Sequence, residues 1–271
     1  MSKKRKTVLI ILLVLIAAFL IDGIICNTTL TVSYHTYDYG TQESIRIVQL
    51  SDLHNASFGK DNSRLLEKVK SLDPDLIVLT GDLIDSTRAK TSVALELSAD
   101  LVQIAPVYFV SGNHEAWMEG YEKFEKDLMQ TGVTVLKNES RQLEINGTTI
   151  NMAGIEDPYF LMNKNSSIEN ELSKIPASDG LNILLSHRPE YFDAYAQSGY
   201  DIVLTGHAHG GQIRLPLIGG MYAPDQGLFP EYDAGVYESG DMNMAVSRGL
   251  GNSVLPLRIN NPAEIVVMDI G

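Results

Sequence analysis

Short apolar runs alternate with amphipathic segments from residue 44 onward. Five of the runs have the length and apolar composition of core strands, and they span residues 45–50, 75–79, 106–110, 181–185 and 200–204. Apolar residues at helical spacing predict helices over residues 64–69, 92–104, 119–130 and 190–197. Strands that alternate with helices pair in parallel through right-handed crossovers. The pattern therefore predicts an α/β fold.

Other signals mark the second half of the chain. Asn146-Gly147, flanked by alternating residues, predicts a hairpin over residues 141–155. Residues 157–165 are expected to form a loop and residues 167–174 a short helix, and strand-like segments follow at 244–246 and 263–269. Two packed sheets flanked by helices are the simplest architecture that keeps the ends of the five core strands at one edge.

The N-terminus has a different pattern. Four cations at residues 3–6 precede an apolar run, and residues 7–26 would span about 30 Å as a helix, which suits a bilayer. A cleaved signal peptide would need a small-x-small site that we do not find here, and Ile25 is bulky for a lipoprotein signal at Cys26. The cations favour a cytoplasmic N-terminus and an extracytoplasmic domain.

We therefore predict a single-pass protein of the cell membrane. A basic cytoplasmic tip and an uncleaved signal anchor occupy residues 1–26, a linker and an edge strand occupy residues 27–43, and one large domain occupies residues 44–271.

Charge narrows the class of partner. The chain has 44% hydrophobic and 20% charged residues and a formal net charge of −13. Residues 1–26 contribute +3 of charge, so residues 27–271 carry −16. A nucleic-acid partner normally demands a basic face, so none is expected. A phosphate substrate would need a bound cation to supply the attraction.

Each of the five predicted core strands is followed directly by side chains that can bind a metal or transfer a proton. The motifs are SDLH, TGD, SGNHE, SH and TGHAHGGQ, and they contain five of the six histidines. Taken singly, Asp82 or Asn113 would suit a turn and His187 a strand end. Ligands gather at the carboxyl ends of such strands, so joint occurrence favours one site. Its candidates are Asp52, His54, Asp82, Asn113, His114, His187, His207 and His209.

The candidates point to a metal centre. Carboxylate, imidazole and amide ligands suit Mn²⁺, Fe²⁺ or Zn²⁺, and the single cysteine, Cys26, excludes a thiolate-rich zinc site. Seven ligand-type side chains are too many for one ion that keeps an open position. They suit two ions roughly 3.5–4 Å apart that share a bridging carboxylate, an arrangement used for displacement at phosphorus.

The motif series also resembles a known family. SDLH, GD, GNHE, SH and GHAHGGQ are similar to the signature of the calcineurin-like metallophosphoesterases, complete and in order over residues 45–212. The resemblance implies a four-layer metallophosphatase-like β-sandwich of two mixed sheets flanked by helices. The later segments GGMYAPDQGLFPEYDAGVY and SRGLGNSVLPLRINNPAE resemble membrane-attached bacterial phosphodiesterases. That branch is similar to enzymes that hydrolyse phosphodiester or pyrophosphate bonds, including that of UDP-diacylglucosamine.

The resemblance also implies a role for each candidate. It divides the seven ligand candidates between two metals, with Asp52, His54 and His209 on one, Asn113, His187 and His207 on the other, and Asp82 as the bridge. A metal-bridging hydroxide would attack phosphorus in line. His114 would stabilise the developing charge or protonate the leaving oxygen. Arg188 and Arg248 are further candidates for binding phosphate oxygens, although a surface salt bridge is the alternative for Arg188.

The expected function is hydrolysis of a phosphodiester or pyrophosphate bond by a membrane-anchored, dinuclear metal enzyme. The alternatives are a phosphomonoesterase and a non-catalytic metal-binding scaffold, and the complete set of eight candidates disfavours the scaffold. Residues 221–237 place apolar side chains among Gly and Pro, and such a segment would shape substrate access or pack over the sheet edge. If it borders the site, the membrane tether favours a lipid-linked substrate.

Overall fold

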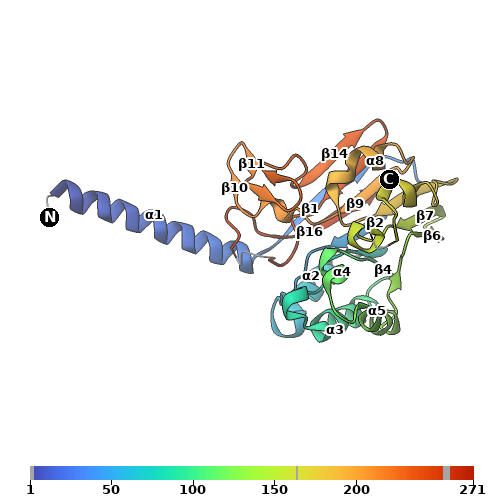
Figure 1. Ribbon diagram of the computed structural model, residues 1–271, viewed down its shortest axis with the longest axis horizontal. Coiled ribbons are helices and arrows are strands. Elements are labelled where there is room, and N and C mark those ends of the chain that lie inside the picture. Colours follow the sequence, from blue (N-terminus) through green and yellow to red (C-terminus); the bar gives the residue numbers. More distant parts are fainter. Residues whose placement is uncertain (1–2, 163, 253–256) are drawn as a thin grey trace.

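Two six-stranded sheets form the centre of the fold in the computed structural model, which describes residues 3–162, 164–252 and 257–271. The first sheet has the order β1 (Leu30–Tyr37), β16 (Ala263–Ile270), β2 (Ile45–Leu50), β3 (Leu76–Thr80), β4 (Val107–Val110) and β5 (Thr134–Val135). The second has the order β14 (Gly235–Ser239), β15 (Met242–Val246), β9 (Ile202–Thr205), β8 (Leu181–Leu185), β7 (Thr148–Gly154) and β6 (Glu139–Ile145). Both sheets are seen in Figure 1.

Both sheets mix parallel and antiparallel pairs. β2, β3 and β4 pair in parallel, as do β7, β8 and β9, which confirms the pairing predicted for strands that alternate with helices. β16 runs antiparallel to β2, and β6 pairs antiparallel with β7 across the Asn146-Gly147 turn. β1 forms an edge, paired in parallel with β16.

The core lies in three apolar layers that follow the alternation along the strands. On β2, Ile45 and Ile47 face the second sheet, whereas Val48 and Leu50 face the helices on the outside. Each fully buried aliphatic side chain of this kind contributes about 1.5–3 kcal/mol to folding. The fold thus has four layers, two of helices outside two of sheet, and the predicted fold class is confirmed.

Amphipathic helices cover the outer faces of the sheets. The first sheet is covered by α2 (Ser63–Ser71), α3 (Thr91–Leu101) and α5 (Tyr121–Gln130), and the second by α7 (Ile168–Leu172) and α8 (Phe192–Ala196). Short helices at loops complete the described elements: α4 (Asn113–Trp117), α6 (Pro158–Met162), and the 3₁₀ turns η1 (Lys60–Asn62), η2 (Ser86–Arg88), η3 (Pro189–Tyr191) and η4 (His209–Gly211).

Two segments differ from the expectation. Residues 157–165 are predicted to form a loop, but α6 begins there because Pro158 suits the first turn and the Asp157 carboxylate accepts the Tyr159 N–H at 3.0 Å. Beyond residue 212, the Gly- and Pro-rich tail forms β14 and two small hairpins. Their strands are β10 (Arg214–Leu215) with β11 (Gly219–Gly220) and β12 (Tyr222–Ala223) with β13 (Gly227–Leu228).

The N-terminal helix α1 (Lys3–Thr28) projects from the domain (Figure 1). It is long and apolar enough to cross a membrane, with a mean hydropathy of 3.2 over its most apolar window. Its last turns contact the domain, where the Asn260 N–H donates to Asp22 Oδ2 at 2.7 Å and the Asn261 N–H to Cys26 Sγ at 3.3 Å. Cys26 is buried by these contacts.

Candidate metal centre

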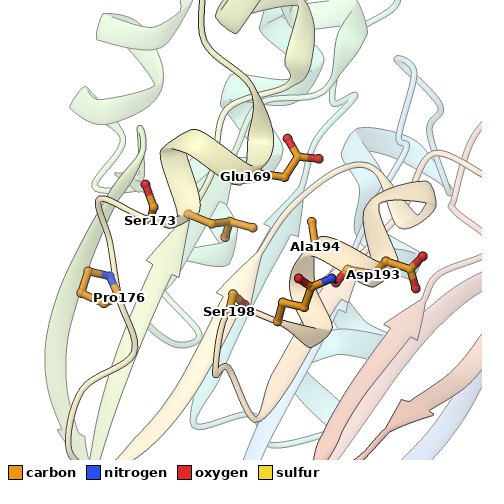
Figure 2. A pocket seen from close by; sticks show the side chains of 8 residues that line it. Glu169, Ser173, Pro176, Asp193, Ala194 and Ser198 are labelled. Carbon is orange, nitrogen blue, oxygen red and sulfur yellow. The ribbon is translucent and has the colours of Figure 1, made fainter.

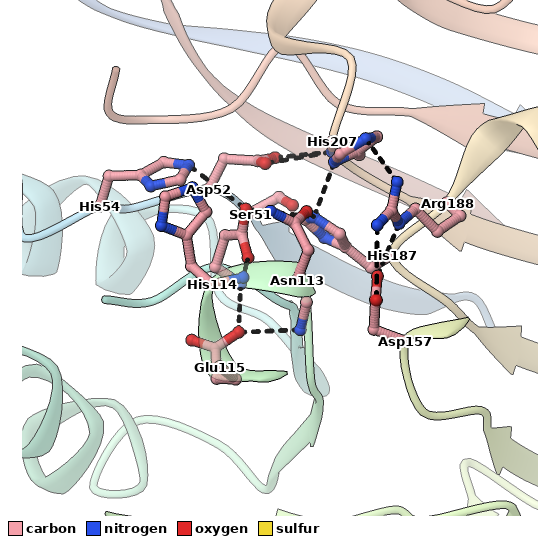
Figure 3. Close-up of polar contacts among 12 residues, drawn as sticks. Ser51, Asp52, His54, Asn113, His114, Glu115, Asp157, His187, Arg188 and His207 are labelled. Carbon is pink, nitrogen blue, oxygen red and sulfur yellow. Dashed lines mark hydrogen bonds and ion pairs between the residues drawn. The ribbon is translucent and has the colours of Figure 1, made fainter. Parts of the chain in front are cut away.

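The eight predicted candidates lie together at the carboxyl ends of β2, β3, β4, β8 and β9. Figure 3 labels Asp52, His54, Asn113, His114, His187 and His207 among them. All eight are buried. The strands place them there because each motif follows a fully paired apolar strand. Beneath the site, the Gln49 side chain donates to Thr80 Oγ1 at 2.9 Å and to the Thr205 carbonyl at 2.8 Å, which links the two sheets.

One group of ligand-type atoms gathers between the ends of β2 and β9. The Nε2 atoms of His54 and His209 lie 3.2 Å apart, and Asp52 Oδ1 lies 3.6 Å from His209 Nε2. The Asp52 carboxylate also accepts the His207 N–H at 3.1 Å, which joins the two loops. Three donor atoms thus converge from two motifs far apart in the sequence.

A second group gathers between β4, β8 and β9. His187 Nε2 lies 3.2 Å from Asn113 Oδ1 and 3.1 Å from His207 Nδ1. The other nitrogen of His187, Nδ1, contacts the Thr80 carbonyl at 2.7 Å. A carbonyl oxygen can only accept a hydrogen bond, so Nδ1 carries a proton. The lone pair of Nε2 is then directed toward the other ligand atoms of the group.

Asp82 lies between the two groups. Its Oδ2 atom is 3.5 Å from His54 Nε2 and 3.2 Å from His187 Nε2, and its Oδ1 accepts the His114 N–H at 2.8 Å. A carboxylate in this place can contact ions on both sides.

Glu115 holds the loop that carries Asp82, and sequence reasoning missed it although it belongs to the GNHE motif. This fully buried carboxylate accepts the N–H of Asp82 at 2.7 Å, of Leu83 at 2.9 Å and of Gly112 at 2.8 Å. It therefore locks the end of β3 to the end of β4. Gly112 is required at this junction, because a Cβ there would meet Asp82 Oδ1.

The backbone is strained at the site. Five of the eight candidates adopt positive φ angles, between 45° and 66°, and these are Asp52, His54, Asp82, His207 and His209. Such conformations are uncommon for residues other than glycine, and they persist only where the surroundings impose them. Their concentration in one place is typical of a functional site.

His114 lies beside the ligand groups, with its ring 4.6 Å from that of His54 and 5.2 Å from that of Trp117. Its Nδ1 accepts the Ser86 N–H at 3.0 Å. A backbone N–H can only donate, so the proton of the neutral imidazole resides on Nε2.

Arg188, a candidate for phosphate binding, is surrounded by carboxylates in this structure. It is buried, its Nε donates to Asp157 Oδ2 at 2.6 Å, and its Nη1 pairs with Asp225 and lies 3.3 Å from Glu190 Oε1. Nη1 also lies 2.9 Å from His207 Nε2, as Figure 3 shows. Because carboxylates already engage the guanidinium, its role in this structure is to hold the loops around His207.

Asp225 is a second residue that the sequence did not single out. It lies in the turn between β12 and β13, and its Oδ2 contacts His207 Nε2 at 3.0 Å. A carboxylate that accepts from one nitrogen of a histidine directs the other toward a metal. The only available signal was its place within the segment GGMYAPDQGLFPEYDAGVY.

Arg248, the other candidate for phosphate binding, pairs with Glu264. Its Nε donates to Glu264 Oε1 at 3.0 Å, and its backbone N–H donates to Oε2 at 2.8 Å. Both arginines are engaged by carboxylates in this structure, and their binding of phosphate oxygens stays a prediction.

Electrostatics in the site favour a bound cation. Burial lowers the pKa of His54 to about 4 and of His207 to about 3, so both imidazoles are neutral and able to ligate. Burial alone would raise the pKa of Asp82, but the imidazoles of His187 and His54 opposite it lower the pKa below its usual value. Asp82 is therefore an ionised carboxylate, the form that binds a cation.

The residues fit divalent metal ions. The ligand atoms of Asp52, His54 and His209 lie within 4.8 Å of one another, and those of Asp82, His187 and His207 do so as well. The donors are all nitrogen and oxygen, which suits Mn²⁺, Fe²⁺ or Zn²⁺.

Two hollows lie on the surface near the second sheet. One, of about 410 Å³ between α7 and α8, is lined by residues such as Glu169 and Asp193 and contains none of the site residues (Figure 2). The other, of about 390 Å³, borders the metal centre, because Arg188 and Asp225 line it together with Tyr159, Met162 and Tyr191. The second is therefore the candidate substrate pocket.

Comparisons with known proteins identify the class. Residues 45–211 match the calcineurin-like phosphoesterases, so the chain belongs to this family, as the motif series predicted. It is a metal-dependent phosphoesterase, and its family is dinuclear.

Three relatives illustrate the likeness. The uncharacterized metallophosphoesterase YkuE of Bacillus subtilis is 32% identical over 238 residues, covering 84% of this chain and 79% of that protein. The phosphodiesterase YaeI of Escherichia coli is 28% identical, covering 83% and 82%. A protein of Bos taurus named transmembrane protein with metallophosphoesterase domain is 30% identical, covering 88% of this chain and 55% of that protein.

Proposed function

We propose that the protein is a membrane-anchored phosphohydrolase that uses two metal ions to cleave a phosphodiester or pyrophosphate bond. The observation that carries this proposal is the convergence of six nitrogen and oxygen ligand side chains in two groups around a seventh, Asp82. An arrangement of this kind suits displacement at phosphorus.

The two groups would hold one ion each, and Asp82 would contact both. The first ion would be held by Asp52, His54 and His209, and the second by Asn113, His187 and His207. When bound, two divalent ions would neutralise phosphate oxygens and lower the pKa of water, which supplies the nucleophile.

His114 would act on the leaving group. Its Nε2 carries the proton because Nδ1 accepts from Ser86, so the neutral imidazole can donate a hydrogen bond that stabilises the charge developing on the leaving oxygen. Removing one preorganised donor of this kind typically lowers the rate by about 10²- to 10³-fold.

The lining of the candidate pocket favours a substrate that is an ester or anhydride with an organic group on both sides of phosphorus. The aromatic rings of Tyr159 and Tyr191 line it beside the metal centre and offer apolar contact to such a group. The name of YaeI, a phosphodiesterase, agrees with this preference. A phosphomonoesterase and a non-catalytic scaffold remain the alternatives to be tested.

Membrane attachment would come from α1. Its length and hydropathy suit a bilayer, and the bovine relative is named a transmembrane protein. Lys3, Lys4, Arg5 and Lys6 would stay in the cytoplasm, which places the domain outside. An anchored enzyme with aromatic side chains in the pocket beside its metals favours a lipid-linked substrate.

The test is hydrolysis by the full chain in detergent. Mn²⁺-loaded protein would be offered bis(p-nitrophenyl) phosphate and, separately, p-nitrophenyl phosphate, with Asp82→Ala as the control. We expect a preference for the diester that the variant loses. A monoester preference would support the phosphatase alternative, and two bound metals without either activity would support the scaffold.

A further inference from the structure

Five large apolar side chains lie exposed on two neighbouring hairpins, and we propose that this apolar surface inserts into the lipid bilayer beside α1. The surface consists of Leu217, Ile218, Tyr222, Leu228 and Phe229. The inference rests on the membrane anchoring that we propose for α1, and it adds a second contact with the same membrane.

These exposed apolar side chains are unusual because they are concentrated in one short segment of the chain. Leu217 is fully exposed, and the other four are between 50% and 70% exposed. Among the described residues outside α1, eleven large apolar side chains are exposed, and five of them fall between residues 217 and 229. Scattered exposed apolar residues need no explanation, but a contiguous group marks a contact with a partner or a membrane.

Two of the five residues have a constrained backbone. Leu217 has a φ of 68° and Phe229 a φ of 56°, a left-handed conformation that bulky residues rarely adopt. The two hairpins are joined, because the Met221 N–H donates to the Ile213 carbonyl at 2.8 Å and the Phe229 N–H to the Met221 carbonyl at 2.9 Å. The two hairpins therefore form one hydrogen-bonded unit that carries the apolar surface.

The same unit is connected to the end of α1. The Asn260 N–H donates to Asp22 Oδ2 of α1 at 2.7 Å, and its side-chain amide donates to the Arg214 carbonyl of β10 at 3.2 Å. Figure 1 shows β10 and β11 on the side of the domain that faces α1. A bilayer crossed by α1 would therefore meet this side of the domain first.

The chemistry of the surface fits the lipid acyl boundary rather than the charged headgroups. Apart from Asp225, which contacts His207 and Arg188, residues 215–230 carry no charged side chain. Residues 27–271 have a net charge of −16, so attraction to anionic lipids cannot drive the contact. Apolar side chains at a membrane interface reach about 5–10 Å into the boundary between headgroups and acyl chains.

Docking would bring the metal centre to the membrane. The turn between β12 and β13 carries Asp225, which contacts His207. Tyr222 and Leu228 pair with each other across the same hairpin. An amphiphilic phosphate substrate could then reach the candidate pocket while its apolar part stays in lipid.

Tryptophan fluorescence in the full chain tests the inference. Trp117 is the only tryptophan, so Trp117→Phe provides a silent background. In that background, Leu217→Trp and Phe229→Trp report on the apolar surface, and Met129→Trp is the matched control, because Met129 is 54% exposed on α5. Each protein is reconstituted into phosphatidylcholine vesicles with or without lipids brominated in the upper acyl chain.

We expect brominated lipid to quench most of the fluorescence at positions 217 and 229 and to leave position 129 unchanged. Equal quenching at all three positions, or none at 217 and 229, would overturn the inference. So would a spectral shift that grows with protein concentration without quenching, because a second copy would then cover the surface. Flotation with vesicles tests α1 separately. Protein that floats without quenching retains the anchor and refutes only the surface, whereas protein that fails to float refutes both.

Discussion

Replacing Asp225 by alanine should weaken the binding of one metal ion and spare the other. In the protein, the Asp225 carboxylate and the Arg188 guanidinium both contact His207 Nε2, at 3.0 Å from Oδ2 and 2.9 Å from Nη1. The carboxylate favours a proton on Nε2, which leaves the Nδ1 lone pair free to ligate. Without it, the guanidinium can only donate to Nε2, so the proton moves to Nδ1 and the ligand atom is lost.

The magnitude follows from this exchange. Losing a carboxylate behind a ligating histidine typically lowers metal affinity by about 10- to 100-fold, or about 1.4 to 2.7 kcal/mol. The Asp225 side chain is 48% exposed, so solvent screens part of its effect and we expect a loss nearer tenfold. Asp225→Asn keeps an acceptor oxygen and should lose less.

Calorimetric titration of metal-depleted full-length protein with Mn²⁺ measures the affinity at each site. Glu231→Ala is the matched control, because it removes one exposed carboxylate from the same segment without a contact to His207. The reasoning is refuted if Asp225→Ala binds both ions as tightly as the control does, or if the asparagine and alanine variants lose affinity equally.

Three further predictions concern the same centre. Asp82→Ala should abolish diester hydrolysis and reduce the metal content measured by mass spectrometry; a variant that keeps both would exclude the bridging position. His114→Ala should retain two metals while turnover falls by about 10²- to 10³-fold, and metal loss would instead place His114 among the ligands. Glu115→Gln should lower the free energy of unfolding by about 1–3 kcal/mol, because backbone N–H groups occupy both carboxylate oxygens and an amide NH₂ would face one of them. Thermal unfolding of metal-depleted protein measures this, and an unchanged midpoint would contradict it.

The layers of the fold and the place of the site could be predicted because both depend on local pattern. The runs at residues 45–50, 75–79 and 181–185 are apolar enough to be strands, and parallel pairing then brings the residues after them to one edge. The pattern of apolar and polar residues along one segment is enough for this prediction. It does not require knowledge of which distant residues contact that segment.

The residues behind the ligands could not be predicted in the same way. Asp225 reaches His207 from 18 residues away, and Glu115 binds backbone groups 33 residues before it. Such contacts depend on how two loops meet, which no periodicity encodes. Arg188 shows the same limit, because only the assembled loops reveal that Asp157 and Asp225 already engage its guanidinium.

Asn261 joins the end of α1 to the metal centre. Its N–H donates to Cys26 Sγ, and its side-chain amide donates to the His209 carbonyl at 2.7 Å. One residue thus links the helix to the backbone of a candidate ligand, and binding free energies coupled through a shared element are reciprocal. Metal binding that orders His209 would strengthen the contact between α1 and the domain. That contact would in turn raise the affinity for metal. A soluble form cut after residue 26 gives up this coupling, whereas one that begins before Asp22 preserves it.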